Sequence, residues 1–168
     1  MIIGSPAGAA PRSQPFAAQA AAAHLTAAQT TALQSKVNGY LTKLGGKQVA
    51  LNQIAFDGGE ILVALPGEAH PRSFAGPQVA LADMCAGQLN GYFCVFQSTY
   101  YTGDELAWWK CASYPMLWSG YGSWKNNQTA GTQAVFRNYS GGVIYTTPGA
   151  YSYSPNYNWT PVYHINIC

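Results

Sequence analysis

The amino-acid sequence predicts an α+β protein, in which an N-terminal helix plus β-hairpin unit is followed by an all-β domain with double Greek-key topology. Apolar residues recur at helical spacing between Thr26 and Leu44, whereas all the tryptophans and eleven of the twelve tyrosines lie after residue 82. There, short apolar segments alternate with Gly, Pro, Asn and Ser turns, which is typical of an antiparallel sandwich or barrel. The expected divisions are a tail at 1–25, the helix and hairpin at 26–66, a linker at 67–81 and the all-β domain at 82–168.

Composition narrows the functional classes. Only 8% of the 168 residues are charged, against about a quarter in an average globular protein. The net charge is +2, and three basic residues balance three acidic ones between Asp83 and Cys168, so the basic cluster that a nucleic-acid phosphate backbone requires is missing. No window approaches the roughly 20 apolar residues of a membrane span. We therefore expect neither nucleic-acid binding nor a membrane span.

The tail at 1–25 consists mainly of Ala, Gln, Pro and Ser. Such a composition cannot bury a core, so the tail is expected to be disordered or loosely helical around Phe16 to Ala23. The first ten residues end in small side chains suited to cleavage and look like the remnant of an export signal. We interpret the protein as secreted and extracellular.

The unit at 26–66 is predicted to contain one amphipathic helix and one hairpin. Leu33, Val37, Tyr40, Leu41 and Leu44 recur three and four residues apart, and Gly45-Gly46 ends the helix.

From 48 to 65 apolar residues alternate around a turn at 57–59, with a slip of phase that predicts a bulge near Asn52-Gln53. Such a unit is too small to be stable alone, so it must pack on the C-terminal domain or on a partner. A pro-segment that masks or assists that domain is one interpretation.

The segment from Cys85 to Gly103 organises the second half of the chain. Side chains alternate across a strand, so residues 92, 94 and 96 share one face and residues 93 and 95 the other. Both sets are apolar or aromatic, which predicts a strand buried on both faces. Tyr101 can fold back over the hairpin, and Gly103 offers positive φ or a close approach to an aromatic ring.

These residues carry a resemblance. The sequence C-A-G-Q-L-N-G-Y-F-C-V-F from Cys85 to Phe96, followed by Y-T-G, resembles the opening of secreted bacterial peptidase inhibitors of the actinomycete metalloproteinase-inhibitor type. The Phe96-x4-Tyr101-x-Gly103 spacing is similar to the folded-hairpin signature of βγ-crystallin domains, whose fold those inhibitors share. The resemblance covers residues 83 to 168 and implies a βγ-crystallin-like double Greek key that inhibits zinc metalloproteases of the thermolysin type.

Four cysteines, Cys85, Cys94, Cys111 and Cys168, predict two disulfides formed in an oxidising compartment. Three pairings are open. We favour Cys85 with Cys94, which closes a short loop, and Cys111 with Cys168, which holds the last residue. Loop-closure entropy assigns about 3 kcal/mol to the first and about 4 kcal/mol to the second. A zinc site is the alternative, but the chain has no C-x2-C pair.

A faint internal repeat supports two Greek keys. Val95-Phe96 followed by Tyr101-Thr102-Gly103 is echoed by Val135-Phe136 followed by Tyr139-Ser140-Gly141. Because the second copy is shorter between its two aromatic residues, its hairpin is predicted to be tighter than the first.

The inventory of side chains argues against an enzyme. The histidines at 24, 70 and 164 fall in a tail, a linker and the last strand, and none belongs to an H-E-x-x-H or nucleophile motif. The adjacent acids Asp104 and Glu105 alternate to opposite faces of a strand, which cannot place two carboxylates across one bond.

No cofactor is expected. βγ-crystallin domains bind calcium through an Asn/Asp-Asn/Asp-x-x-Ser/Thr-Ser loop, and Asn126-Asn127 matches its first two positions. Ala130 and Gly131 stand where hydroxyls are needed, and the loop has no carboxylate. Asn126 and Asn127 are therefore only a weak calcium candidate, and no metal site is predicted.

Recognition by shape remains. A nearly uncharged, disulfide-bonded domain rich in Tyr and Trp is suited to presenting a rigid loop to a protease or another extracellular protein, since rigidity removes the cost of ordering a flexible segment. The predicted function is a secreted peptidase inhibitor. The alternatives are a non-inhibitory module that binds cell-wall glycan or an extracellular protein, and a purely structural crystallin-like protein. The candidate contact residues are Tyr114, Trp118, Tyr121, Trp124, Tyr151, Tyr153 and Tyr157.

Overall fold

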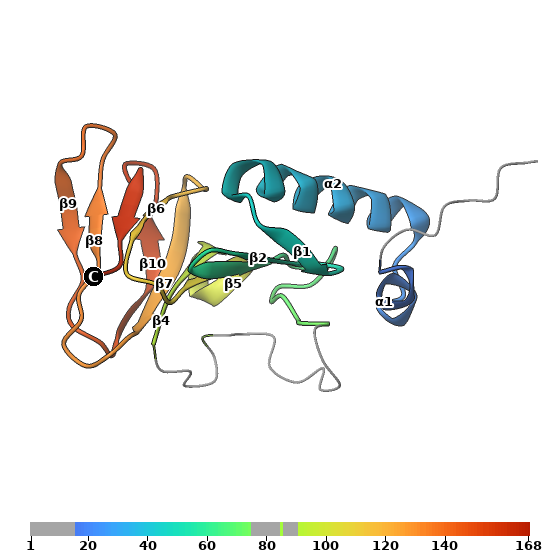
Figure 1. Ribbon diagram of the computed structural model, residues 1–168, viewed down its shortest axis with the longest axis horizontal. Coiled ribbons are helices and arrows are strands. Elements are labelled where there is room, and N and C mark those ends of the chain that lie inside the picture. Colours follow the sequence, from blue (N-terminus) through green and yellow to red (C-terminus); the bar gives the residue numbers. More distant parts are fainter. Residues whose placement is uncertain (1–15, 75–84, 86–90) are drawn as a thin grey trace, which may run out of the picture.

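The computed structural model describes residues 16–74, 85 and 91–168 (Figure 1). The fold is α+β and mostly antiparallel sheet, with the helices near the N-terminal end of the described chain. The elements in order are α1 Ala17–Ala22, α2 Ala27–Leu44, β1 Lys47–Ala50, β2 Gln53–Phe56, β3 Gly59–Leu62, β4 Tyr92–Ser98, the 3₁₀ turn η1 Thr99–Tyr101, β5 Thr102–Trp108, β6 Ser113–Pro115, β7 Tyr121–Asn127, β8 Val135–Arg137, β9 Val143–Thr146, β10 Ser152–Asn158 and β11 His164–Asn166.

The strands form two sheets. The large sheet has the order β1-β2-β3-β5-β4-β7-β10, and the small sheet has the order β6-β11-β8-β9. Every neighbouring pair in both sheets is antiparallel. β3 pairs with β5 along its whole length, from Gly59 opposite Trp108 to Leu62 opposite Glu105. The N-terminal hairpin therefore packs on the later strands by extending their sheet.

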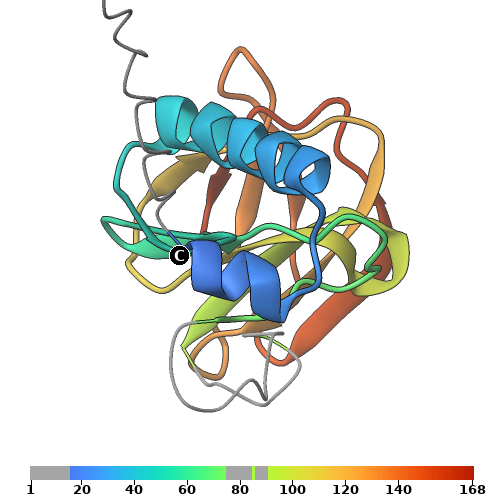
Figure 2. The same cartoon turned by 90° about the vertical axis from the view of Figure 1, so that its right-hand side faces the viewer.

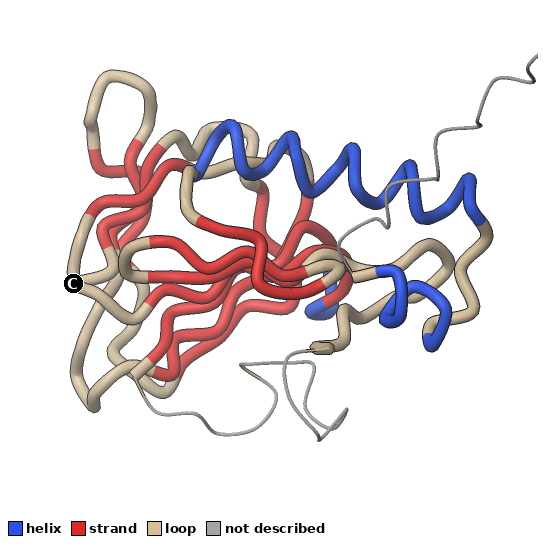
Figure 3. The backbone as a smooth tube through the Cα atoms, turned by 45° about the vertical axis from the view of Figure 1, so that its right-hand side comes forward, coloured by secondary structure: helices blue, strands red, loops and turns tan. Residues whose placement is uncertain are grey.

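Helix α2 is specified locally, as the sequence predicts. The Thr26 side chain accepts from the Gln29 backbone N–H while the Gln29 side chain accepts from the Thr26 N–H, which completes a capping box. Gly45 follows the last turn at φ 69°, a conformation that favours glycine. Leu33, Val37 and Tyr40 are the buried residues of the helix. Figure 3 shows α2 running alongside the strands of the large sheet.

A tight turn replaces the bulge predicted near Asn52-Gln53. Ala50 lies opposite Gln53 in the β1–β2 ladder, so the chain reverses between them and makes an additional strand. Asn52 is fully buried, and its Nδ2 donates to the carbonyl oxygens of Val63 (2.7 Å) and Arg72 (2.9 Å). The predicted position of the bulge is wrong, because the chain reverses direction there, but the β1–β2 ladder does have a register irregularity between Gln48 and Ala50.

Part of the tail at 1–25 is ordered as α1, which lies at the end of the molecule where α2 begins (Figures 1 and 2). The Leu51 backbone N–H donates to Gln19 Oε1 at 2.6 Å, and Gln19 Nε2 donates to the Phe74 carbonyl at 3.3 Å. The helical alternative for residues 16–23 is therefore the correct one. Residues 1–15 of the tail and 75–81 of the linker lie outside the described residues.

One apolar core joins α2 and both sheets through side chains such as Val37, Phe93, Trp108 and Phe136. Phe93 stacks on Trp108 and Trp124 with ring centroids 6.5 and 6.0 Å apart, and it meets Phe136 edge-on at 6.0 Å. A second, smaller cluster covers the opposite face of the large sheet and contains Leu62, Cys85, Cys94, Phe96 and Ala107. The prediction that β4 is buried on both faces is confirmed.

The turn between β4 and β5 folds back as predicted. The Tyr101 ring lies edge-on to Phe96 with centroids 5.5 Å apart, and Gly103 has φ 79°. The echo in the second half behaves differently. Tyr139 is 80% exposed and packs on Tyr163 instead of Phe136. The predicted tighter hairpin is also wrong, because Arg137 pairs with Val143 across a longer turn than the one between Ser98 and Thr102.

Both predicted disulfides are present. Cys85 bonds to Cys94 with the Cα atoms 6.4 Å apart, and Cys111 bonds to Cys168 with the Cα atoms 5.6 Å apart. The first is buried against the outer face of the large sheet, whereas the second is exposed at the edge of the small sheet. The favoured pairing is confirmed.

Candidate functional site

The segment from Trp109 to Ser113, here called the 109–113 loop, is exposed at every residue between two buried positions, Trp108 and Tyr114. It begins where β5 ends and leads into β6. The Trp109 indole is 44% exposed and touches Tyr92 edge-on with centroids 5.6 Å apart. The loop thus presents an aromatic residue, a lysine and a half-cystine consecutively on the surface.

Several bonds hold this loop in place. The backbone N–H groups of Trp109 and Lys110 both donate to the Gly58 carbonyl, at 3.0 and 3.3 Å. The Ile167 N–H donates to the Ala112 carbonyl at 3.2 Å, and the Cys111–Cys168 disulfide ties the loop to the end of β11. The turn of the N-terminal hairpin therefore supports the loop from one side and the last strand supports it from the other.

Tyr114 anchors the loop from below. Its ring stacks on Trp108 with centroids 4.9 Å apart, and its hydroxyl donates to the Lys110 carbonyl at 2.7 Å. Burial raises the pKa of Tyr114, and the negative charge of Asp57 raises it further, so the hydroxyl remains a donor at neutral pH. A Cβ at Gly58 would collide with this hydroxyl, so the support requires glycine there.

Lys110 lies against Asp57, with Nζ 2.7 Å from Oδ2. The hydrogen bond to Asp57 and the charge of that carboxylate raise the pKa of Lys110. Both side chains are exposed, so the pair adds little to stability. It does orient the Lys110 side chain in the middle of the loop.

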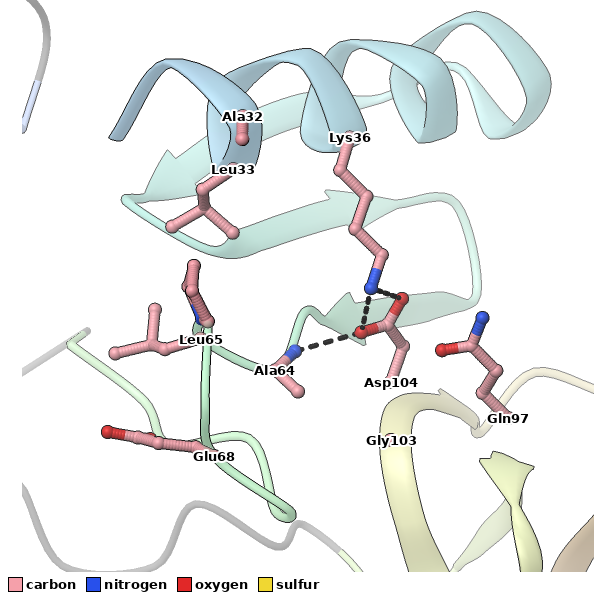
Figure 4. A pocket seen from close by; sticks show the side chains of 10 residues that line it. Ala32, Leu33, Lys36, Ala64, Leu65, Glu68, Gln97, Gly103 and Asp104 are labelled. Atoms are coloured by element: carbon pink, nitrogen blue, oxygen red, sulfur yellow. Dashed lines mark hydrogen bonds and ion pairs between the residues drawn. The ribbon is translucent and has the colours of Figure 1, made fainter. Parts of the chain in front are cut away.

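A pocket of about 330 Å³ lies between α2 and β5 (Figure 4). Asp104 at its floor is fully buried and accepts from Lys36 Nζ (2.8 Å), the Tyr40 hydroxyl (2.6 Å) and the Ala64 backbone N–H (2.9 Å). Trp118 Nε1 donates to the same Tyr40 oxygen at 2.8 Å.

Desolvation by burial, together with the charge of Asp104, raises the pKa of the Tyr40 hydroxyl. Asp104 thus accepts hydrogen bonds from one charged donor, Lys36, and two neutral donors. A buried carboxylate requires such partners. The network fixes α2 to β5, and its role is explained by packing.

Asp104 and Glu105 lie on opposite faces of β5, as alternation predicts. Asp104 contacts α2, whereas the Glu105 carboxylate lies within 4.8 Å of the sulfur atoms of Cys85 and Cys94 on the other face. Those two cysteines are bonded to each other. This grouping, the only one of three metal-type side chains among the described residues, therefore does not offer three free ligands.

The candidate calcium residues do not converge. Asn126 is fully buried in β7, and its Nδ2 donates to the Thr132 carbonyl at 2.8 Å. Asn127 Nδ2 donates to the Cys85 carbonyl at 3.3 Å, on the opposite face of the strand. Two adjacent strand residues cannot direct their oxygens at one ion.

The predicted contact residues divide into three groups. Tyr114 and Trp124 are core residues, with 7% and 1% exposure, so the prediction of surface contacts is wrong for them. Trp118 and Tyr157 are partly buried against the core. Exposed side chains are found only for the remaining three, Tyr121, Tyr151 and Tyr153.

Sequence reasoning missed Trp109 and Lys110. A signal was available, because both residues directly precede Cys111 and a half-cystine fixes the chain beside it. The neighbouring Trp108 made this signal ambiguous. Two adjacent tryptophans at the end of a strand must face opposite sides, and the sequence does not say which one is buried.

Comparisons with known proteins add no relative: no family model, no curated protein and no solved structure matches the chain. None of the helices in the described part of the chain is long and apolar enough to cross a membrane.

Proposed function

We propose that the protein is a secreted peptidase inhibitor that inserts the 109–113 loop into the active-site cleft of a zinc metalloprotease. The proposal rests on one observation: the loop is exposed to solvent and yet held in a fixed conformation. All five residues from 109 to 113 are exposed, yet a disulfide, the Tyr114 hydroxyl and three backbone hydrogen bonds hold them.

Restraint of this kind favours tight binding. Ordering a rotamer-rich side chain on binding costs about 0.5–1.5 kcal/mol, and a loop that is already held avoids much of this cost. Tryptophan is among the residues that dominate binding energies at protein interfaces. Trp109 would supply buried area, while Lys110, already oriented by Asp57, would supply charge.

The loop would act as a substrate that is released slowly. Cys111 is joined to Cys168, and Ala112 is hydrogen-bonded to Ile167. If a protease cleaved a bond in the loop, these connections would keep the new ends in place. Rejoining or slow dissociation would then compete with product release. The resemblance of residues 83 to 168 to actinomycete metalloproteinase inhibitors is the reason for choosing zinc enzymes as the target class.

The strand order supports the double Greek-key part of the proposal. A Greek key places its fourth strand beside its first. β7 lies beside β4 in the order β5-β4-β7, and β11 lies beside β8 in the order β9-β8-β11. The third strand of each set, β6 or β10, lies in the sheet of the other set. The sets β4–β7 and β8–β11 thus have the same strand order, and each gives one strand to the sheet of the other. A duplicated βγ-crystallin-like domain requires this arrangement.

Secretion is supported by the two disulfides, because such bonds persist mainly in oxidising compartments. Both join residues of the proposed inhibitor domain, and the exposed one supports the proposed inhibitory loop directly. Reduction of the exposed disulfide should therefore weaken inhibition.

The test is an inhibition assay with the full chain against zinc, serine and cysteine proteases. We expect inhibition of a thermolysin-type enzyme, with Trp109→Ala raising the inhibition constant about 30-fold, as for an interface residue worth about 2 kcal/mol. Tyr121→Ala is the matched control, because Tyr121 is 65% exposed and lies outside the loop. No inhibition of any zinc protease, or equal loss in both variants, would refute the proposal.

A further inference from the structure

A pocket of about 490 Å³ lies on the outer face of the small sheet. Its floor is made by Ser113 of β6, Arg137 of β8, and His164 and Asn166 of β11, and the turn at 138–141 forms its wall. His164 is directly opposite Arg137, and Asn166 is directly opposite Ser113. Residues opposed in this way project from the same face with Cβ atoms about 5 Å apart. The register therefore gathers the four side chains at one place.

Arg137 gives the pocket a positive charge. Residues 106–168 contain Lys110, Lys125 and Arg137 but neither Asp nor Glu. Arg137 donates from Nη1 to the Gly141 carbonyl at 2.8 Å, and among the described residues it forms no ion pair. A planar guanidinium with unused donors is well suited to bind a carboxylate with two parallel hydrogen bonds.

Two aromatic rings stand beside this charge. Tyr139 is 80% exposed and Tyr163 is 51% exposed. Their rings are perpendicular with centroids 5.0 Å apart, and the Tyr163 ring is 5.4 Å from that of His164. The two neighbouring rings form a small aromatic patch that a ligand can cover. The C–H face of a pyranose ring is an apolar surface of the right size to lie on a tyrosine.

Polar groups complete the pocket. The side-chain oxygen of Asn166 is buried and has no hydrogen-bond partner among the described residues. Buried polar atoms are normally hydrogen-bonded, so a ligand or water could supply the missing partner once the amide group turns toward the pocket. The exposed hydroxyl of Ser113 lies on the neighbouring strand. Neighbouring donors and acceptors of this kind can bond the hydroxyl groups of a sugar.

We propose that this pocket binds a sugar residue that carries a carboxylate, such as a unit of an acidic extracellular glycan. Arg137 binds the carboxylate, Tyr139 contacts the ring, and Asn166 and Ser113 meet the hydroxyls. Tyr163 supports the Tyr139 ring from the side. The volume falls within the range of about 300–1,000 Å³ of small-molecule sites. The pocket shares Ser113 with the 109–113 loop but includes neither Trp109 nor Lys110, so the proposal does not depend on protease inhibition. An inhibitor with such a site would be held at that glycan.

The probe is trigalacturonate, and the matched control is its methyl ester, which has the same rings and no charge. Titration of the full-length, disulfide-bonded protein, followed by ¹H–¹⁵N NMR, should give a dissociation constant on the order of 1 mM or below for the acid. The ester should bind at least about tenfold more weakly, because one charge-assisted pair is lost. Shifted amides should include those of residues 137–141 and 163–166.

Variants assign the contacts. Arg137→Gln and Tyr139→Ala should each weaken binding of the acid about tenfold or more, and Arg137→Lys should fall between wild type and Arg137→Gln because a lysine keeps charge but loses the planar fork. Tyr153→Ala is the control, since Tyr153 is 71% exposed on the other sheet. An unchanged thermal unfolding midpoint shows that each variant folds.

Three results would overturn the proposal: equal affinity for acid and ester, absence of any shift at 10 mM probe, which lies above the millimolar range of weak binding, or equally tight binding of an acetylated dipeptide with a free carboxylate. Trp109→Ala separates sugar binding from protease inhibition, because Trp109 does not line the pocket. It should leave trigalacturonate binding unchanged whether or not it abolishes inhibition, so either proposal can fail without the other.

Discussion

The two sheets differ in the treatment of their outer faces. On the large sheet, Cys94, Phe96 and Ala107 point away from the main core and are still fully buried. On the small sheet, Arg137 and His164 point outward and stay partly exposed. The strand sequences explain this difference. The segment F-C-V-F in β4 is continuously apolar, whereas H-I-N in β11 alternates between polar and apolar residues. A continuous apolar segment indicates a strand covered twice, and an alternating one indicates a face left for solvent or a ligand.

The turns that flank these faces differ in the same way. After β4, Tyr101 folds inward over Phe96, and Lys125 Nζ lies 4.4 Å from the centroid of the Tyr101 ring. After β8, the corresponding Tyr139 points outward to Tyr163. The position over Phe136 is filled instead by Tyr145 and Tyr157, with centroids 5.5 and 5.1 Å away. Other rings thus cover Phe136 in the main core, and Tyr139 lines the surface pocket.

Of the changes that test the difference between the two sheets, removal of the disulfides should alter the free energy of unfolding most. The pair Cys111→Ala and Cys168→Ala opens a closure of 57 residues and should lower the free energy of unfolding by about 4 kcal/mol. The pair Cys85→Ala and Cys94→Ala opens a closure of 9 residues and should lower it by about 3 kcal/mol. Denaturant unfolding of both double variants measures this. A loss below about 1 kcal/mol in either would show that its sheet does not depend on the bond.

Substitution of Tyr101 and Tyr139 should give the next largest difference in the free energy of unfolding. Tyr101→Ala removes a partly buried ring from Phe96 and should lower the free energy of unfolding by about 2 kcal/mol, somewhat less than a fully buried aromatic residue. Tyr139→Ala removes an exposed ring and should change it by less than about 0.5 kcal/mol. Similar losses in both variants would mean that the two hairpins are equivalent, contrary to their contacts.

The glycines of the same turns form a smaller matched pair. Gly103 has φ 79° and Gly141 has φ 80°, so an alanine at either position is strained by about 1 kcal/mol. A Cβ at Gly103 would also lie 3.1 Å from Gln97 Cβ and Ser98 Oγ, whereas a Cβ at Gly141 would meet no atom within 4 Å. Gly103→Ala should therefore lower the thermal midpoint further than Gly141→Ala. The reverse order would contradict the crowding at the first turn.

Local signals in the sequence predicted much of the fold. The apolar spacing predicted α2, and Gly45 marked its end. The continuous apolar sequence of β4 predicted burial on both faces, and the favoured one of three possible disulfide pairings is the one present. Each of these depends on residues close together in the chain, or on the few ways of pairing four cysteines.

Long-range relations were harder to predict. A slip in alternation can come from a bulge or from a reversal, and only the pairing of Ala50 with Gln53 decides between them. The surface residues were partly predictable: Tyr121 and Trp124 of β7 are an odd number of positions apart, so they must face opposite sides. Which side is covered depends on the small sheet, which the sequence does not place.

The smallest expected effect concerns Glu60, which pairs with Ala107 and so projects from the covered outer face of the large sheet. Burial raises the pKa of its carboxyl group, and the hydrogen bond from Gln53 Nε2 (2.6 Å) opposes this. A raised pKa in the folded state means that the unfolded chain releases this proton first, at its ordinary pKa of about 4.3. The contribution of Glu60 to stability is then complete below about pH 4 and is lost as the pH rises.

Glu60→Gln should therefore leave the free energy of unfolding unchanged at about pH 3 and raise it at pH 7, by less than about 1 kcal/mol because the side chain keeps contact with solvent. The amide oxygen can still accept from Gln53, so packing is preserved. Denaturant unfolding of both proteins from pH 3 to pH 7 measures the difference. A variant that is less stable than wild type at pH 7 would show that this charge is well solvated and that the outer face is more open than its apolar residues indicate.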